Sequence, residues 1–538
     1  MEVWLERTVK WLLGPEIASE KSPSHLWPRW FFLRALGLIY FSAFYSLLFQ
    51  IKGMMGPNGL LPARDFLQAV AGAFHWARFW YAPTVFWVRS GDRALMLVCW
   101  AGLVASVLIL CNVWPRATLA VAFVCFISFV TAAQVFSGFQ SDDMLLEAGF
   151  ISLFFAPPGL FPGLGRAHPA SRASLYMLRW EWFRIYFESG VAKIVSHDYS
   201  WRHFTAMDDY YQNAPLPTWI GWYVGHLPHW FHASAVFYTL AVELLLAFMV
   251  FLPRRFRTAC FFIVAPFQIS IILTGNYTFL NYLVFLLGFL LLDDRFVEWI
   301  VPQRLRNLVE RPSAPEADEF PLPEKWPARW RRRLAPLRMA IAGVCFASIF
   351  YVTAALLCFL IAPSLPLPEK PIRLLAPLRI ASRYGLFANM THERREIEFQ
   401  GSMDGVTWTP YLFRYKPQDP GKAPGIYAPY QPRFEWDLWF ASLGAWPEYH
   451  FVVSTQERLL QNEPDVLALF ANNPFPDAPP LRVRAVVYRY WFTDMKTKRE
   501  TGMWWQRELL GDYSPPLERE PDGRIFLIDR PTVEPPAP

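Results

Sequence analysis

The residues best suited to chemistry lie in one otherwise apolar segment, residues 175–194. Glu181, Arg184 and Glu188 are spaced i, i+3, i+7 there, so a helix places them on one face, where the arginine can pair with both carboxylates. Charges inside a membrane span are costly and normally face the interior of the bundle or a wet cavity. The spacing therefore favours a buried salt-bridge ladder with a structural role.

Lys193 lies near the outer end of the same segment and off the face that carries Glu188. A lysine at such a position usually extends its ammonium group to the membrane interface. If the side chain is buried instead, burial disfavours the charged form and makes the amine a candidate base. The catalytic candidates are then Lys193, Glu188, Arg184 and His197.

The next segment, residues 195–234, is rich in aromatic and histidine side chains. Tryptophan and tyrosine prefer the headgroup boundary of a bilayer, which favours a loop and a short helix lying on the outer leaflet. Exposed aromatic rings also serve as adaptable contacts for a protein partner. The candidates for binding a lipid or a client protein are Trp201, Trp219, Trp222, His226, His229, Trp230 and His232.

Three of these histidines, His226, His229 and His232, lie within two turns of a helix. Their i, i+3, i+6 spacing is not a specific metal signature, and no adjacent acidic residue completes a ligand set. The six cysteines lie in or at the ends of apolar runs without a C-x-x-C spacing, and no Gly-rich phosphate loop is present. We predict neither a bound metal nor a cofactor.

Four further acidic residues lie in apolar runs or at the start of one: Asp142, Asp143, Glu147 and Glu243. A buried contact with a basic residue of another span, such as Arg34, explains them without catalysis.

These segments belong to a membrane protein, since the 538-residue chain is 54% apolar and 17% aromatic, more than a soluble fold needs. We predict a transmembrane domain over residues 31–362 with eight or nine spans, because two of the apolar stretches contain charges. Stretches long enough to cross a hydrocarbon core of about 30 Å occur at 31–50, 94–113, 116–136, 142–158, 175–194, 234–252, 258–274, 277–293 and 338–362.

Basic residues orient the spans, because they accumulate in cytoplasmic loops. With the N-terminus inside, the inside segments carry several times more lysine and arginine than the outside loops, above all the loop 293–338. The N-terminus is therefore predicted to be cytoplasmic and the C-terminal region extracytoplasmic. The net charge of +6 is explained by this orientation, so we predict no nucleic-acid partner. Residues 1–30 predict either an interfacial amphipathic helix or a packed N-terminal helix.

Residues 372–517 show the period-two alternation of strands and predict a β-rich domain outside the membrane. Strands are expected around 396–400 and over 483–492, and Asp404-Gly405 is the turn signal of a hairpin.

Short inserted helices are expected over 455–462 and 465–471, and a Pro-rich tail over 518–538. The hairpin resembles that of discoidin-like sandwiches. The predicted fold class is an α-helical polytopic membrane domain with a C-terminal β-sandwich-like domain of jelly-roll or discoidin-like type.

Long motifs in both halves of the chain resemble the lipase maturation factor family. They are Arg29-Trp-Phe-Phe-Leu-Arg-Ala-Leu-Gly-Leu-Ile-Tyr-Phe41, Gly56-Pro-Asn-Gly-Leu-Leu-Pro62, Trp201-Arg-x-x-Thr-x-Met-Asp208, His226-Leu-Pro-x-Trp-Phe-His232, Gly275-Asn-Tyr-Thr-Phe-Leu-Asn281, Tyr384-Gly-Leu-Phe387 and Asn473-Pro-Phe475. The resemblance implies a membrane protein of the secretory pathway that helps certain lipases fold and assemble, with membrane lipid and a secreted lipase as partners. The implied location is the endoplasmic reticulum membrane in a eukaryote, or the inner membrane in a bacterium.

A shorter motif, Ser189-Gly-Val-Ala-Lys-Ile194 with the downstream Trp201, is similar to the membrane domain of vitamin K-dependent gamma-carboxylase. In that enzyme a lysine of the matching motif acts as a base, which implies this role for Lys193. The alternative function is thus an intramembrane enzyme acting on a lipid-like substrate or cofactor. We favour the non-enzymatic folding factor, and we rank a transporter last because no internal repeat is present.

Overall fold

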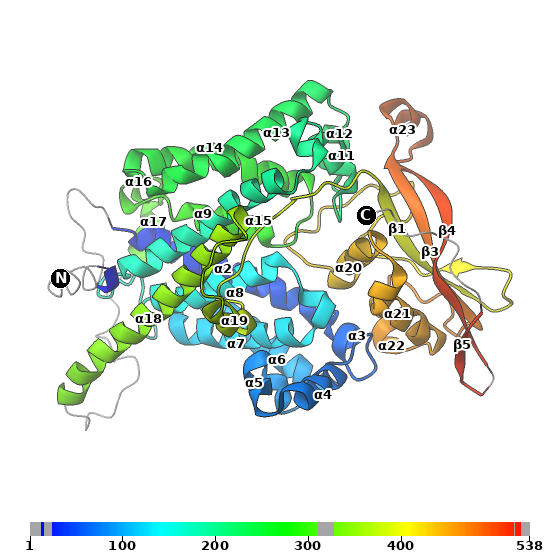
Figure 1. The fold of residues 1–538 in the computed structure, drawn as a ribbon, viewed down its shortest axis with the longest axis horizontal. Coiled ribbons are helices and arrows are strands. Elements are labelled where there is room, and N and C mark those ends of the chain that lie inside the picture. The colour runs from blue at the N-terminus through cyan, green and yellow to red at the C-terminus, as the bar shows by residue number, and fades with distance from the viewer. Residues whose placement is uncertain (1–11, 15–23, 310–327, 521, 529–538) are drawn as a thin grey trace.

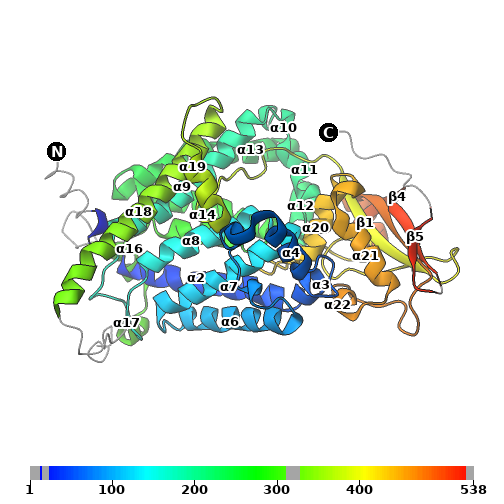
Figure 2. The ribbon, with the colours of Figure 1, turned by 60° about the horizontal axis from the view of Figure 1, so that its bottom comes forward.

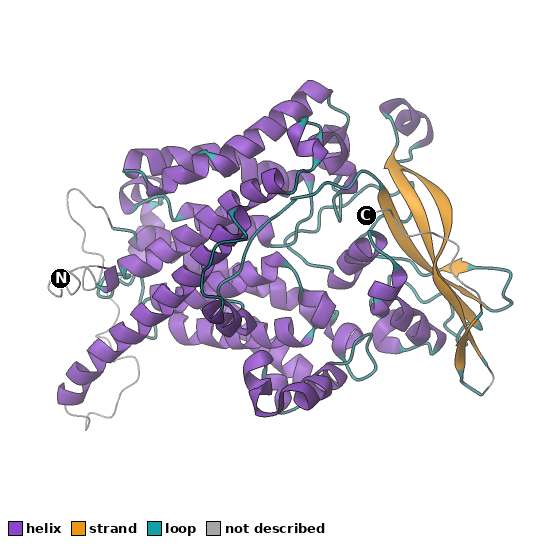
Figure 3. Ribbon diagram, in the orientation of Figure 1, coloured by secondary structure: helices purple, strands orange, loops and turns teal. Residues whose placement is uncertain are grey.

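The computed structural model describes residues 12–14, 24–309, 328–520 and 522–528. Helices fill one part of the molecule, and the strands of the sheet gather at the opposite end (Figures 1 and 3). The predicted amphipathic segment 1–30 lies mostly outside the described residues, as does the centre of the basic loop 293–338.

Six described helices are long and apolar enough to cross a membrane, and each coincides with a predicted span. Figure 2 shows α2, α6 and α7 running side by side. The six are α2 (Leu26–Leu48), α6 (Asp92–Leu110), α7 (Pro115–Ala132), α13 (His229–Leu244) with its continuation η4 (Leu246–Phe251), α14 (Arg254–Thr274) and α18 (Ala328–Ile361).

The three remaining predicted spans are also helical but differ from these six. The helices α8 (Gln140–Phe155) and α9 (Arg172–Val195) carry buried charges, and α15 (Leu280–Phe289) is short. Helix α9 packs against α8, α13, α15 and α18. It therefore lies inside the bundle, where charges can be paired.

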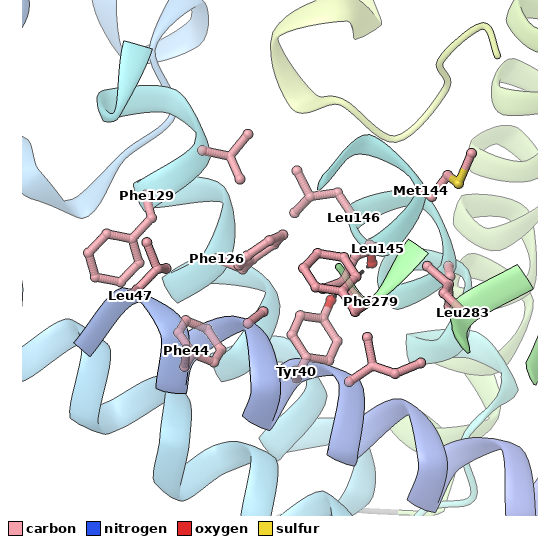
Figure 4. Close-up of a cluster of buried hydrophobic side chains, with 14 of the residues drawn as sticks. Tyr40, Phe44, Leu47, Phe126, Phe129, Met144, Leu145, Leu146, Phe279 and Leu283 are labelled. Carbon is pink, nitrogen blue, oxygen red and sulfur yellow. Dashed lines mark hydrogen bonds between the residues drawn. The ribbon is translucent and has the colours of Figure 1, made fainter. Parts of the chain in front are cut away.

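Aromatic side chains interlock at the centre of the bundle (Figure 4). Tyr40 packs edge-on against Phe126, with ring centroids 5.9 Å apart, and its buried hydroxyl donates to the carbonyl oxygen of Leu145 at 3.2 Å. Gly149 makes this approach possible, because a Cβ atom there would lie 2.0 Å from the Tyr40 hydroxyl. The core thus fixes α2 against α7 and α8.

Shorter helices connect these elements. They are α3 (Ile51–Met55), α4 (Ala63–Phe74), η1 (His75–Ala77), α5 (Arg78–Tyr81), η2 (Val85–Trp87), η3 (Gln134–Ser137), α10 (Tyr199–Arg202), α11 (Ala206–Asn213), α12 (Trp219–Gly225), α16 (Asp294–Ile300), α17 (Gln303–Val309), α19 (Lys370–Leu375) and η5 (Ala376–Leu378).

The C-terminal domain contains an antiparallel five-stranded sheet with the order β2-β1-β3-β4-β5. Its strands are β1 (Arg394–Ser402), β2 (Thr409–Pro410), β3 (Arg482–Phe492), β4 (Trp505–Arg519) and β5 (Ile525–Leu527). The predicted hairpin is confirmed: β1 and β2 pair, and Gly405 in the turn between them has φ +73°, which favours glycine. Strand β5 extends the sheet beyond residue 517.

Helices cover the face of this sheet that is turned toward the bundle (Figure 1). They are α20 (Arg433–Ser442), η6 (Trp446–Glu448), α21 (His450–Leu460) and α22 (Pro464–Leu467), whereas α23 (Met495–Thr501) lies between β3 and β4 in the chain. The predicted inserted helices are confirmed, although α21 begins five residues earlier than expected.

The sandwich prediction is not confirmed, because the described residues form one sheet on which helices take the place of a second. The alternation of polar and apolar residues in β1 is typical of a strand with one exposed face, but both faces of β1 are buried. Ile397 and Phe399 face the hydrophobic side, while Glu396 forms an ion pair with Lys416 at 2.9 Å.

Candidate functional site

The charged face of α9 is buried and pairs with a neighbouring helix. Arg184 forms an ion pair with Glu147 of α8 and lies 3.9 Å from a carboxylate oxygen of Glu188. All three side chains are fully buried. The prediction that Arg184 bridges Glu181 and Glu188 is therefore wrong for Glu181, since the guanidinium is directed at α8 instead.

The third partner of this cluster is an extended segment that the sequence did not connect with it. Residues 380–393, which we call the strap, follow η5, pass along α9 and lead to β1. Arg184 donates to the Ser382 carbonyl oxygen at 2.8 Å, and Glu188 accepts the amide hydrogen of Tyr384 with N and O 2.6 Å apart. The Tyr384 hydroxyl donates to Glu147 at 2.8 Å.

Lys193 continues the same pattern one turn further along α9. Its side chain is only 1% exposed, and Nζ lies 2.8 Å from Glu243 of α13 and 2.9 Å from the Leu386 carbonyl oxygen. The Trp201 ring lies 5.0 Å from Nζ. The prediction that Lys193 extends to the interface is wrong, because Glu243 and the strap provide its partners inside the protein.

The four catalytic candidates do not form one pocket. Glu188 bonds to the Tyr384 amide, and His197 pairs with Arg202 at an exposed position. Lys193 and Arg184 contact different carboxylates and different residues of the strap. Arg184, Glu188 and Lys193 share the strap as a partner, whereas the partner of His197 is Arg202.

A segment without regular secondary structure that packs against helices needs this kind of support. Its peptide groups have no helical or sheet partners, and an unsatisfied group at membrane depth costs several kcal/mol. The buried side chains of α8 and α9 supply the missing donors and acceptors. They hold the strap in place, and this gives Arg184, Glu188 and Lys193 a structural role.

The support continues outside α9. The Trp201 indole donates to the Phe387 carbonyl oxygen at 2.9 Å, Ser196 donates to that of Ala388 at 2.8 Å, and Asn213 donates to that of Thr391 at 2.7 Å. The strap is therefore fixed along its length up to β1.

A second buried link joins the two domains. Asp142 at the start of α8 accepts two hydrogen bonds, at 2.7 and 2.8 Å, from Arg433 at the start of α20. Asp143 pairs with Arg379 at 3.0 Å. The suggested partner Arg34 is wrong for these acids, since the Arg34 guanidinium donates to the Trp30 carbonyl oxygen of its own helix.

The aromatic segment divides into buried and exposed residues. Trp201 and Trp222 are buried, and His232 is as well, whereas Trp219 and Trp230 are exposed. The Trp222 indole donates to the Trp504 carbonyl oxygen at 3.0 Å. Nε2 of His226 lies 2.8 Å from the Thr493 carbonyl oxygen. Trp222 and His226 thus belong to the contact with the sheet domain, which leaves Trp219, Trp230 and His229 on the surface.

The histidine triplet is also divided. His229 and His232 each place Nδ1 2.9 Å from Asp208 of α11. The sequence shows no acidic residue beside these histidines, and another helix supplies one. No group of three histidine, cysteine or acidic side chains suited to a metal ion occurs in the part of the chain that the structure describes. His226 is turned away toward the sheet domain.

Sequence reasoning missed the residues that complete this arrangement, namely Tyr384, Ser382, Leu386 and Arg433. Three of them act largely through the backbone of the strap, whose contacts have no pattern in the sequence. Tyr384 belongs to the family motif Tyr384-Gly-Leu-Phe387. This motif is the one signal in the sequence that points to the strap.

The helical bundle, the strap and the sheet domain define a membrane protein whose two parts are joined as one body. Residues 27–299 match the model of the lipase maturation factor transmembrane domain, and residues 380–515 match that of the lipase maturation factor C-terminal domain. The chain belongs to the lipase maturation factor family. The second match begins where the strap begins.

Relatives share this similarity over nearly their whole length. The chain is 31% identical to lipase maturation factor 1 of Bos taurus over 93% of this chain and 90% of the relative. It is 31% identical to lipase maturation factor 1 of Homo sapiens over 95% and 92%, and 30% identical to lipase maturation factor 2 of Gallus gallus over 91% and 81%. No solved structure matches the chain.

Proposed function

We propose that this protein assists the folding of a secreted lipase or a related client on the extracytoplasmic side of a membrane. In this proposal α8, α9 and α15 add to the six apolar helices to give eight or nine spans, with a cytoplasmic N-terminus. The basic inside loops support this orientation. The names of the relatives support the lipase client.

The observation that carries the proposal is the open outer edge of strand β4. Strand β5 pairs only with residues Leu517, Glu518 and Arg519 of β4. The preceding residues 506–509 pair with β3 on one side, and residues 506–510 are exposed, with Leu509 51% accessible. Figure 1 shows this part of the sheet at the far end of the molecule from the transmembrane helices.

An open edge can receive another strand. Its unpaired peptide groups bond to an extended segment irrespective of sequence, and exposed side chains such as Leu509 and Leu510 add apolar contacts. An incompletely folded client offers such segments. Arg507 and Glu508 flank the apolar pair, and charges on an edge limit self-association.

The test replaces Leu509 and Leu510 with lysine, which removes the apolar contacts and adds charge. We expect the yield of active secreted lipase in a co-expression assay to fall several-fold, with the level and melting temperature of the maturation factor unchanged. The matched control is Leu412→Lys, where an exposed leucine of the same domain lies outside the strands of the sheet.

A photoreactive amino acid at position 509 provides the direct readout. We expect cross-links to the co-expressed client, and an excess of unlabelled client should compete for them. Unchanged lipase maturation in the double lysine variant, together with no client cross-link at position 509, would exclude this edge as the client site.

A further inference from the structure

A groove of about 720 Å³ lies between α2 and α15 and is not used by the strap or the sheet edge. Leu38 and Phe41 of α2 form one wall, and Phe285 and Phe289 of α15 form the other. Its volume is in the range of sites that enclose a small ligand. Because both helices belong to the transmembrane bundle, the groove lies beside the bilayer.

The two ends of the groove differ in polarity. At its inner end Phe31 packs edge-on against Phe289, with ring centroids 5.9 Å apart, and no hydroxyl group lines this part. The hydroxyl-bearing residues are grouped at the other end, toward the sheet domain: Ser42, Tyr45, Tyr282, Tyr427 and Tyr430. The groove is therefore amphiphilic along its length.

The sheet domain closes the polar end. Residues 427–430 lie across it, and both walls hold them in place. Ser42 donates to the Pro429 carbonyl oxygen at 2.8 Å, Tyr282 donates to that of Ala428 at 3.1 Å, and Tyr45 packs edge-on against Tyr430. The groove is thus continuous with the contact between the two domains.

We propose that this α2–α15 groove binds one acyl chain of a membrane phospholipid, with its ester end beside Tyr45 and Tyr430. An apolar tail with a polar group at one end matches the distribution of side chains along the groove. Van der Waals packing against the aromatic walls favours the tail. The Ser42 and Tyr282 hydroxyls are bonded to the backbone, which leaves the Tyr45 hydroxyl to donate to an ester. The bound chain contacts both domains, so it strengthens their contact.

The test reconstitutes the full chain in phosphatidylcholine nanodiscs that contain a phospholipid with a photoreactive diazirine in its acyl chain. We expect peptides of α2, α15 and residues 427–430 to be labelled several-fold more than peptides of α6. Leu38→Trp fills the groove and should reduce this labelling several-fold. Leu97→Trp is the matched control, because Leu97 on α6 is 71% exposed and lies outside the groove.

A second variant tests the closed end without adding bulk. Tyr427→Ala opens the roof of the groove, and retention of lipid after detergent exchange, measured by native mass spectrometry, should fall several-fold. Equal labelling of α2, α15 and α6, or labelling of the groove that Leu38→Trp leaves unchanged, would mean ordinary bilayer contact and would overturn the proposal. Neither readout depends on a lipase client.

Discussion

The strap and the outer edge of β4 are both extended backbone, but their peptide groups are treated in opposite ways. Along the strap, buried side chains of α9 and its neighbours bond to the peptide groups of Tyr384 and Leu386. Along residues 506–509 of β4, only β3 is paired and the other side is open.

This difference assigns different roles to the two segments. A backbone whose bonds are all made inside the protein is fixed, whereas one with open bonds can receive a partner. Buried charges near the strap therefore serve attachment, whereas the open edge of β4 is the segment that we propose for client recognition. The following predictions address this comparison.

The largest effect is expected for Arg184→Met. The change leaves Glu147 and Glu188 buried without their cation and removes a donor from Ser382, which should cost about 3–5 kcal/mol of stability. Thermal unfolding and tryptic cleavage within the strap measure the loss. Arg373→Met is the control, since Arg373 forms an exposed ion pair with Glu369 and should change stability by less than about 1 kcal/mol.

Lys193→Met should destabilise the protein by about 3 kcal/mol, because Glu243 remains buried without its partner. The double variant Lys193→Met with Glu243→Leu removes both charges and should recover most of the melting temperature. We expect lipase maturation to recover with it. A double variant that folds but has lost all function would instead support Lys193 as a base.

Trp222→Phe tests the second contact between the domains. It removes the hydrogen bond to the Trp504 carbonyl oxygen, which then keeps only the amide hydrogen of Thr493, at a cost of about 1 kcal/mol. Trp219→Phe should change stability by less than about 0.5 kcal/mol, because Trp219 is exposed. Equal melting temperatures for both variants would show that Trp222 contributes nothing to this contact.

The smallest effect concerns Asp404 in the turn between β1 and β2. The backbone N–H groups of Thr407 and Val406 bond to its carboxylate and hold its pKa well below the usual range. The native state therefore binds fewer protons there. This stabilisation is complete above the unfolded pKa of about 3.9 and is lost as pH falls through the folded pKa.

The comparison of wild type with Asp404→Asn measures this contribution. The difference in melting temperature should be greatest near neutral pH and should shrink below about pH 4. A difference that stays constant across the acid range would contradict the assignment.

The sequence alone determined the membrane class, six apolar spans, the β1–β2 hairpin and strand β3. These features follow from local patterns: long apolar runs, an alternation of period two and an Asp-Gly turn. It also identified Glu188 and Arg184 as paired residues, because charge in an apolar run is visible without a structure, whereas it favoured the membrane interface for Lys193.

Only the tertiary structure decided what those charges contact. The spacing of Glu181, Arg184 and Glu188 indicated pairing within one helix, but Glu147 from α8 lies closer to the guanidinium, and the strap arrives from about two hundred residues further along the chain. Likewise Trp222 and His226 have the composition of a surface aromatic segment, yet the sheet domain covers them. Helical periodicity fixes which residues share a face, whereas long-range packing chooses the partner of that face, and hydrogen bonds to distant backbone leave no pattern in the sequence.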